Sequence, residues 1–371
     1  MFVNNQLHDS NQNSMAHMNS IFSERFKSAR LLRGLSLAEL AEKLENKISR
    51  QALHKYERGE VSPNSDMLGY LCKALDVPQE FFFRETKVEL GEIAFRKLDK
   101  LPAKEENRII EETKDYLSRY LELEEIIGIA SDFINPLKDF QVIETFDDVE
   151  KAAIEVRKKW NLGKDAIANT VQLLEDNHIK VIEIDAEVGF DGMQTLVNRK
   201  IPVIAINISR VKTDDRKRFT VMHELGHLVM KMNDNIPNPK KEKFCHFFAG
   251  AMLFPKDALI KELGASRSKL LIQELGVLKG EYGISLQAMV MRAMLVGIIS
   301  KKFCESFFDY LREKNWQIEE PFKYQSGEKS KRFKQLLYRA LGEELISMSK
   351  AAGFVNKSVA EFRAEPYLNM E

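Results

Sequence analysis

The stretch RFTVMHELGHLVM, residues 218–230, contains two histidines, His223 and His227, and a glutamate, Glu224, directly after the first. Four residues of an α-helix turn through about 400°, so both imidazoles leave one face of the helix about one turn apart. That spacing suits two ligands of a single Zn²⁺ ion. Glu224 lies beside the first histidine, where a general base for zinc-assisted hydrolysis is needed.

The residues around this motif predict a largely buried helix. Two histidines and a glutamate on such a helix cost several kcal/mol unless a partner satisfies them. A zinc ion is such a partner, and we favour it over a pair of hydrogen-bonded core histidines with a surface glutamate. The apolar residues that predict burial are Phe219, Val221, Met222, Leu225, Leu228 and Val229.

A zinc site of this type needs a third protein ligand. The extended metzincin motif requires glycine at 230 and histidine at 233, where this chain has Met230 and Asn233, so that class is excluded. The next predicted helix offers Glu242 and His246, four residues apart on one face, and either side chain can ligate. A carboxylate gives a His₂Glu set with water, so we favour Glu242, with His246 as the alternative. The alternative interpretation of Glu242 is a solvent-exposed acid in the first turn of a helix, with no role in metal binding.

The motif has neighbours that match a known family. IPVIAIN (residues 201–207) precedes it and EKFCHFFAGAMLFP (residues 242–255) follows it, and together these stretches resemble the ImmA/IrrE family of metallopeptidases. The resemblance covers about residues 150–300. It implies an α+β zincin-like domain, Glu242 as the third zinc ligand beside the two histidines, and Glu224 as the catalytic base of a zinc-dependent endopeptidase.

Two further features of the site are hypotheses from the sequence. IPVIAIN reads as a strand, and a strand beside the metal can bind an extended substrate by strand addition. His178 and Tyr282 are candidates for the group that stabilises the oxyanion, although each also fits a purely structural position. The sequence does not separate zinc from manganese or another divalent ion.

A second set of motifs lies near the N-terminus. SLAELAEKL (36–44), SRQALHKYERG (49–59) and SPNSDMLGYLCKALDV (62–77) read as short helices, and they resemble the XRE/Cro-repressor helix-turn-helix family. The resemblance implies that the middle helix enters the major groove of a double-stranded DNA operator. A helical bundle with a solvated basic face is the alternative. The expected DNA-binding residues are Ser49, Arg50, Gln51, His54, Lys55 and Arg58, with Arg25, Lys27 and Arg30 as further phosphate contacts.

Composition limits the remaining classes of protein. The 371 residues carry a formal net charge of zero, so DNA binding must depend on a local patch. Three dispersed cysteines fit a reducing compartment, and no apolar run is long enough to span a membrane, so we expect a cytoplasmic protein. The expected order is a disordered tail (1–19), an all-α helix-turn-helix domain (20–86), a helical linker or spacer (87–145), the metallopeptidase domain (146–300) and a helical C-terminal region (301–371).

These features together predict a multidomain DNA-binding transcriptional regulator with a fused zinc endopeptidase. The family resemblance implies a protein substrate that is a repressor or an antitoxin-like regulator. A single helix-turn-helix domain binds DNA weakly, which favours a homodimer on a two-fold operator. The alternative function is a non-catalytic repressor or antitoxin whose zinc domain acts as a sensor or partner-binding module.

Overall fold

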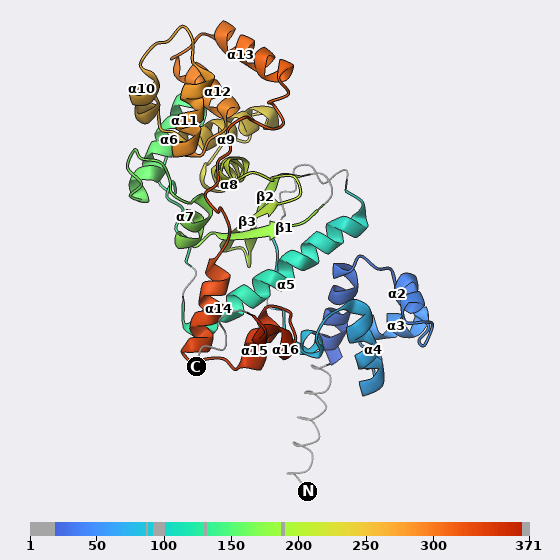
Figure 1. Ribbon diagram of the computed structural model, residues 1–371. Helices are drawn as coiled ribbons and strands as arrows, with labels where there is room; N and C mark the ends of the chain where they lie inside the picture. The colour runs from blue at the N-terminus through green and yellow to red at the C-terminus, as the bar shows by residue number, and fades with distance from the viewer. Residues whose placement is uncertain (1–18, 87, 92–100, 130–131, 187–189, 366–371) are drawn as a thin grey trace. The chain divides into compact units, whose positions relative to one another are not determined.

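The computed structural model describes residues 19–86, 88–91, 101–129, 132–186 and 190–365 (Figure 1). All but residue 19 of the predicted N-terminal tail therefore lies outside the described residues. The chain divides into two compact units. The first unit contains Met1–Glu89, Lys100–Ala130 and Phe333–Glu371, and the second contains Leu90–Asp99 and Ser131–Arg332.

The first unit begins with short helices whose ends are fixed by polar caps. The Ser36 side chain caps α2 and forms a capping box with Glu39, while Ser49 and Asn64 accept hydrogen bonds from the first turns of α3 and α4. The apolar faces meet in one core that includes Phe26, Leu40 and Leu53. The elements are a helix over residues 19–32, α2 (Leu37–Lys43), α3 (Arg50–Glu57), α4 (Ser65–Leu75) and the 3-10 helix η1 (Gln79–Phe83).

The long helix α5 (Ala103–Ile127) is part of the first unit's structure, whereas its sequence suggests a spacer. Asp115 on α5 is buried and accepts a hydrogen bond from Arg25 of the first helix at 2.6 Å. Tyr120 and Leu123 pack into a core with the C-terminal helices (Figure 1). Those helices are α14 (Arg332–Gly342), α15 (Met348–Phe354) and α16 (Val359–Arg363).

The second unit is α+β and has a small three-stranded sheet. The strands are β1 (Lys180–Ile184), β2 (Gly192–Val197) and β3 (Ile201–Asn207), in the order β1-β3-β2. β3 pairs in parallel with β1 and antiparallel with β2. Because both of its edges are paired, β3 is the central strand, and six of its seven residues are buried.

Helices pack against this sheet and form with it the main core of the second unit (Figure 1). α8 carries the His-Glu motif and lies against β2, β3 and α9. Gly226 allows α8 to approach α9 closely, since a Cβ at this position would lie 3.2 Å from the Phe248 ring and 3.5 Å from the Cys245 backbone. The helices are α6 (Phe146–Lys159), α7 (Thr170–Asp176), α8 (Asp214–Val229), α9 (Asn238–Leu253), α10 (Lys256–Leu263), α11 (Ile272–Tyr282), α12 (Leu286–Val296) and α13 (Lys301–Glu313).

A buried ion pair holds the N-terminal half of α8. Arg218 and Glu328 have fully buried side chains and lie 2.5 Å apart. The Glu328 carboxylate also accepts the backbone N–H groups of Thr170 and Val171 at the start of α7. Lys217, one residue earlier on α8, donates to the Glu328 carbonyl at 2.8 Å. The segment around Glu328 thereby fixes α8 to α7.

We expect Glu328→Gln to destabilise the second unit by about 3–5 kcal/mol, because it leaves the buried Arg218 cation without its counter-charge. Urea unfolding followed by tryptophan fluorescence reports this unit specifically, since both tryptophans, Trp160 and Trp316, belong to it. Glu319→Gln is the matched control, because the Glu319–Lys323 pair is 78% and 75% exposed. An equal urea midpoint for the two variants would contradict the structural role of the buried pair.

Candidate metal centre and DNA-binding helix

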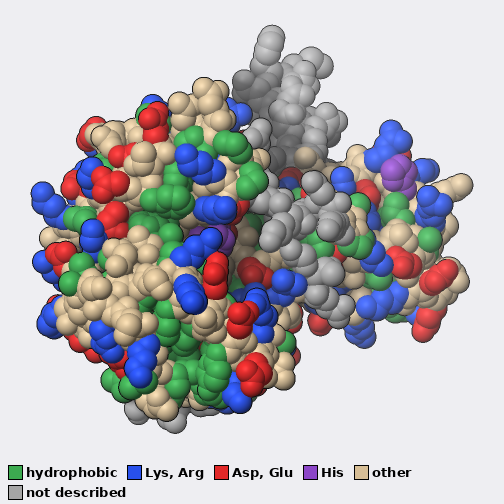
Figure 2. Space-filling view, turned by 90° about the horizontal axis from the view of Figure 1, so that it is seen from above, with side chains coloured by type: hydrophobic (Ala, Val, Ile, Leu, Met, Phe, Trp, Pro, Cys, Tyr) green, Lys and Arg blue, Asp and Glu red, His purple; other side chains and the backbone are tan. Residues whose placement is uncertain are grey.

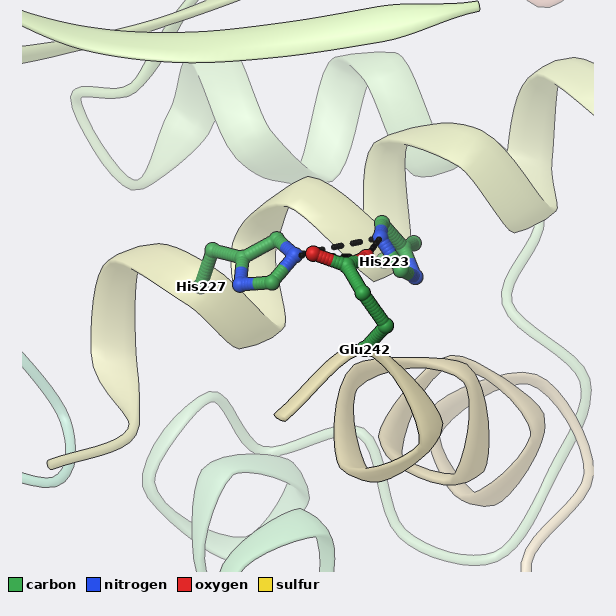
Figure 3. A group of neighbouring side chains, drawn as sticks. All are labelled: His223, His227 and Glu242. Carbon is green, nitrogen blue, oxygen red and sulfur yellow. Dashed lines mark hydrogen bonds and ion pairs between the residues drawn. The ribbon is translucent and has the colours of Figure 1, made fainter. Parts of the chain in front are cut away.

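Three side chains from two helices converge in the second unit. His223 and His227 project from one face of α8, and Glu242 reaches them from the first turns of α9 (Figure 3). The two Nε2 atoms lie 3.1 Å apart, and a Glu242 oxygen lies 3.1 Å from His223 Nε2 and 3.5 Å from His227 Nε2. The structure thus brings together the three residues that the sequence suggests as metal ligands.

These separations fit a tetrahedral zinc site. Zinc bonds to nitrogen and oxygen are near 2.0–2.1 Å, so two ligand atoms of a tetrahedron lie about 3.3 Å apart. The three observed separations of 3.1, 3.1 and 3.5 Å are close to that value. Two neutral imidazoles and one carboxylate are also a donor set that zinc accepts in hydrolytic sites.

The surroundings of the three ligands are asymmetric. The side chains of His223 and His227 are 11% and 3% exposed, whereas that of Glu242 is 35% exposed. Nδ1 of His227 lies 3.0 Å from the buried Cys245 thiol on α9. A partner on the second ring nitrogen fixes the orientation of a ligating histidine. The cluster is therefore anchored on the α8 side and accessible on the Glu242 side.

The side chain of Glu224, a residue of α8, is packed against the start of the edge strand β2. The residue is 8% exposed, and β2 begins at Gly192 directly against it. A Cβ on Gly192 would lie 3.1 Å from Cγ and 3.3 Å from Oε1 of Glu224, and 2.6 Å from the Thr220 methyl. A side chain at position 192 would clash with the Thr220 methyl and crowd the Glu224 side chain, so glycine suits this position. Sequence reasoning did not identify Gly192, which lies in a strand that the apolar pattern did not predict.

His246 packs beside the ligand group without joining it. Its ring centroid lies 4.4 Å from that of His223 and 5.9 Å from that of Phe219. The group of closely spaced ligand atoms found among the described residues contains Glu242 and not His246. The two suggested oxyanion groups lie elsewhere: His178 is in the turn before β1, and Tyr282 is buried in the core with its ring 3.8 Å from that of Phe254.

The hypothesis that IPVIAIN binds substrate by strand addition is wrong. This stretch is β3, whose two edges are both paired within the sheet. The strand at the edge nearest α8 is β2, which contacts the motif helix directly. Its sequence, GMQTLV, lacks the branched apolar run that made β3 recognisable. The physical reason for the error is that the most apolar strand of a small sheet is usually the central one.

The first unit presents an exposed polar face on α3. Its N-cap residue Ser49 uses its hydroxyl to accept the Ala52 N–H at 3.2 Å. The six DNA contacts predicted on and beside α3 are all exposed, although Arg58 also pairs with Glu60 at 2.9 Å. At the right of Figure 2, histidine and Lys or Arg side chains gather on one end of this part of the molecule. The exposed residues are Ser49, Arg50, Gln51, His54, Lys55 and Arg58.

Two of the suggested phosphate contacts have a structural role instead. Arg25 is 2% exposed and binds Asp115 and the Phe81 carbonyl, at 2.6 and 3.0 Å. Arg30 is 9% exposed and donates to Glu57 at 2.7 Å. The expectation that these two arginines contact DNA is therefore wrong. Lys27, on the same helix, is exposed.

These features define a metallopeptidase-like domain that follows a helix-turn-helix domain. Comparison with protein families confirms both resemblances: residues 174–294 match the IrrE N-terminal-like domain of the peptidase M78 family, and residues 26–82 match a helix-turn-helix domain. The helix-turn-helix match indicates a DNA-binding regulator. No curated protein and no solved structure matched the chain. No helix among the described residues is long and apolar enough to cross a membrane.

The roles of Glu242 and His246 can be separated by metal content. We expect Glu242→Ala to lose most bound zinc, since it removes a ligand, and His246→Ala to keep about one zinc per chain. Protein purified in parallel and analysed by atomic emission gives the stoichiometry. The reverse pattern would identify His246 as the third ligand, the alternative that the sequence leaves open.

Proposed function

We propose that this protein is a DNA-binding transcriptional regulator whose second unit is a zinc-dependent endopeptidase that cleaves a partner regulatory protein. The main support is the convergence of His223 and His227 of α8 with Glu242 of α9, whose ligand atoms lie within 4.8 Å of one another. Glu224 lies on α8 beside the first of these ligands. The family match of residues 174–294 supports a peptidase-type domain. The expected substrate is a repressor or an antitoxin-like regulator.

In this proposal His223, His227 and Glu242 hold the zinc ion. When bound, zinc supplies Lewis acidity that lowers the pKa of water toward neutrality and polarises a carbonyl group. The Glu224 carboxylate accepts the proton of the attacking water and then donates it to the amine that leaves. Its fixed position between α8 and Gly192 supports this role, because a general base needs a defined orientation.

We assign the substrate-binding strand to β2. Gly192 and Gln194 alternate with the β2 residues whose backbone groups face β3. The hydrogen bond from Gly91 N to Leu196 O supports the proposal, because a backbone group already pairs with the outer edge of β2 at that residue. An extended peptide added beside Gly192 would pass Glu224 and the three ligands. Main-chain hydrogen bonds of this kind bind a peptide with little dependence on its sequence.

The first unit supplies the DNA contacts in this proposal. The exposed N-terminal half of α3 reads bases in the major groove, with Arg50 suited to guanine and Gln51 to adenine. Lys27, Lys55 and Arg58 hold phosphates. A homodimer doubles these contacts on a two-fold operator, which compensates for the small basic surface of one copy.

We expect Glu224→Gln to abolish cleavage while zinc content and DNA affinity stay close to those of the wild type, because only the proton-accepting group is lost. New protein N-termini compared by mass spectrometry, between cells that express the wild type and the variant, reveal the cleaved partner. If the wild type produces no new N-termini, or the variant regulates its target genes as well as the wild type, the non-catalytic sensor remains as the explanation.

For DNA recognition, we expect Gln51→Ala to weaken binding to a selected operator by about 1–3 kcal/mol and to relax preference at one base pair. Operators are selected from random duplexes with the full chain, and affinities are measured at fixed salt. Ser65→Ala, in the first turn of α4 beyond the recognition helix, serves as the control variant. Equal operator affinity for the wild type and Gln51→Ala would contradict the assignment of α3.

A further inference from the structure

An open apolar pocket of about 460 Å³ lies in the second unit between helices α6, α8, α9 and α12. Three large apolar residues on its wall, Phe146, Met291 and Leu295, are 37%, 39% and 44% exposed. Phe219 and Phe247 complete the apolar lining. Clustered exposure of large apolar side chains marks a binding surface, and the volume is in the range of ligand pockets.

This pocket shares a wall with the candidate metal centre. His246 lines the pocket, and its ring lies 4.4 Å from the ring of the ligand His223. Phe219, one turn before His223 on α8, also lines the pocket. A peptide held at the metal centre therefore has a neighbouring side chain within reach of the pocket.

The cations of the pocket wall do not provide a site for an acidic group. Arg292 is buried and neutralised by Glu150, at 2.8 and 3.0 Å, and it donates to the Phe254 carbonyl at 2.6 Å. Lys243 is exposed to solvent, so its ammonium group stays hydrated. An acidic side chain entering the pocket would lose its hydration beside an arginine whose charge Glu150 already compensates, whereas an apolar side chain gains by leaving water.

We propose that this pocket determines specificity by accepting one bulky apolar side chain, such as leucine, methionine or phenylalanine, next to the substrate bond at the metal centre. The inference rests on the proposed peptidase function and specifies its substrate class. Burial of such a side chain strengthens binding by about tenfold to a hundredfold over glycine.

The test compares N-acetyl-leucine hydroxamate with N-acetyl-glycine hydroxamate, because the hydroxamate binds the metal in both and only the side chain differs. Calorimetry with the zinc-loaded full chain should give at least about tenfold tighter binding for the leucine compound. Ala288→Leu narrows the pocket from α12 and should reduce that preference to less than threefold. Val277→Ala is the control, because Val277 on α11 is 74% exposed and lies outside the pocket.

Met291→Asp is a second pocket variant, and it should fold normally because Met291 is partly exposed. It should weaken binding of the leucine hydroxamate and leave binding of the glycine hydroxamate unchanged. Equal affinities of the wild type for the two compounds, or a leucine preference that survives both pocket variants, would overturn the inference. Absence of binding by the leucine compound would overturn it as well. Failure of cleavage in cells, with the leucine preference intact, counts against the proposed peptidase function alone.

Discussion

The close packing of α8 on α9 is the constraint on which the metal centre depends. The ligands come from both helices, so their separation follows from the distance between the two helix axes. Gly226, inside the motif itself, permits this approach, since a Cβ there would crowd the Phe248 ring at 3.2 Å. The same contact places the Cys245 thiol 3.0 Å from His227 Nδ1. Gly226 thus favours the helix packing that brings the ligands and the supporting thiol together.

The charged residues in the first half of α8 are stabilised by a segment that is distant in sequence. Arg218 and Lys217 meet the segment around Glu328, which follows α13 in sequence. Burying these charged side chains without a partner of opposite charge would lower the stability of the fold by several kcal/mol. The pairing therefore explains how a helix with a low apolar content in its first half lies in the core. It also gives the segment after α13 a structural function in the metallopeptidase-like unit.

The sequence predicted the elements that have a strong local pattern. The helix with His223, the strand that became β3 and the capped helices of the first unit all follow from residue spacing and caps. Glu242 was favoured as a ligand both from its place on the next helix and from the family resemblance. β2 was missed because GMQTLV has no clear alternation of apolar and polar residues. The partner of Arg25 was beyond local reasoning, since Asp115 lies 90 residues away in sequence. Whether an arginine is exposed to solvent depends on the tertiary structure, so local sequence patterns do not predict it.

Burial of Arg25 and Arg30 changes the electrostatic account of DNA binding. The net charge of the chain is zero, so attraction to phosphates depends on the exposed cations near α3. Because Arg25 and Arg30 are buried, the exposed cations near α3 form only a small basic surface. The exposed acids Glu42 and Glu60 flank it. Few phosphate contacts give low non-specific affinity and a shallow salt dependence. Low affinity of a single copy is the physical argument for the dimeric binding proposed above.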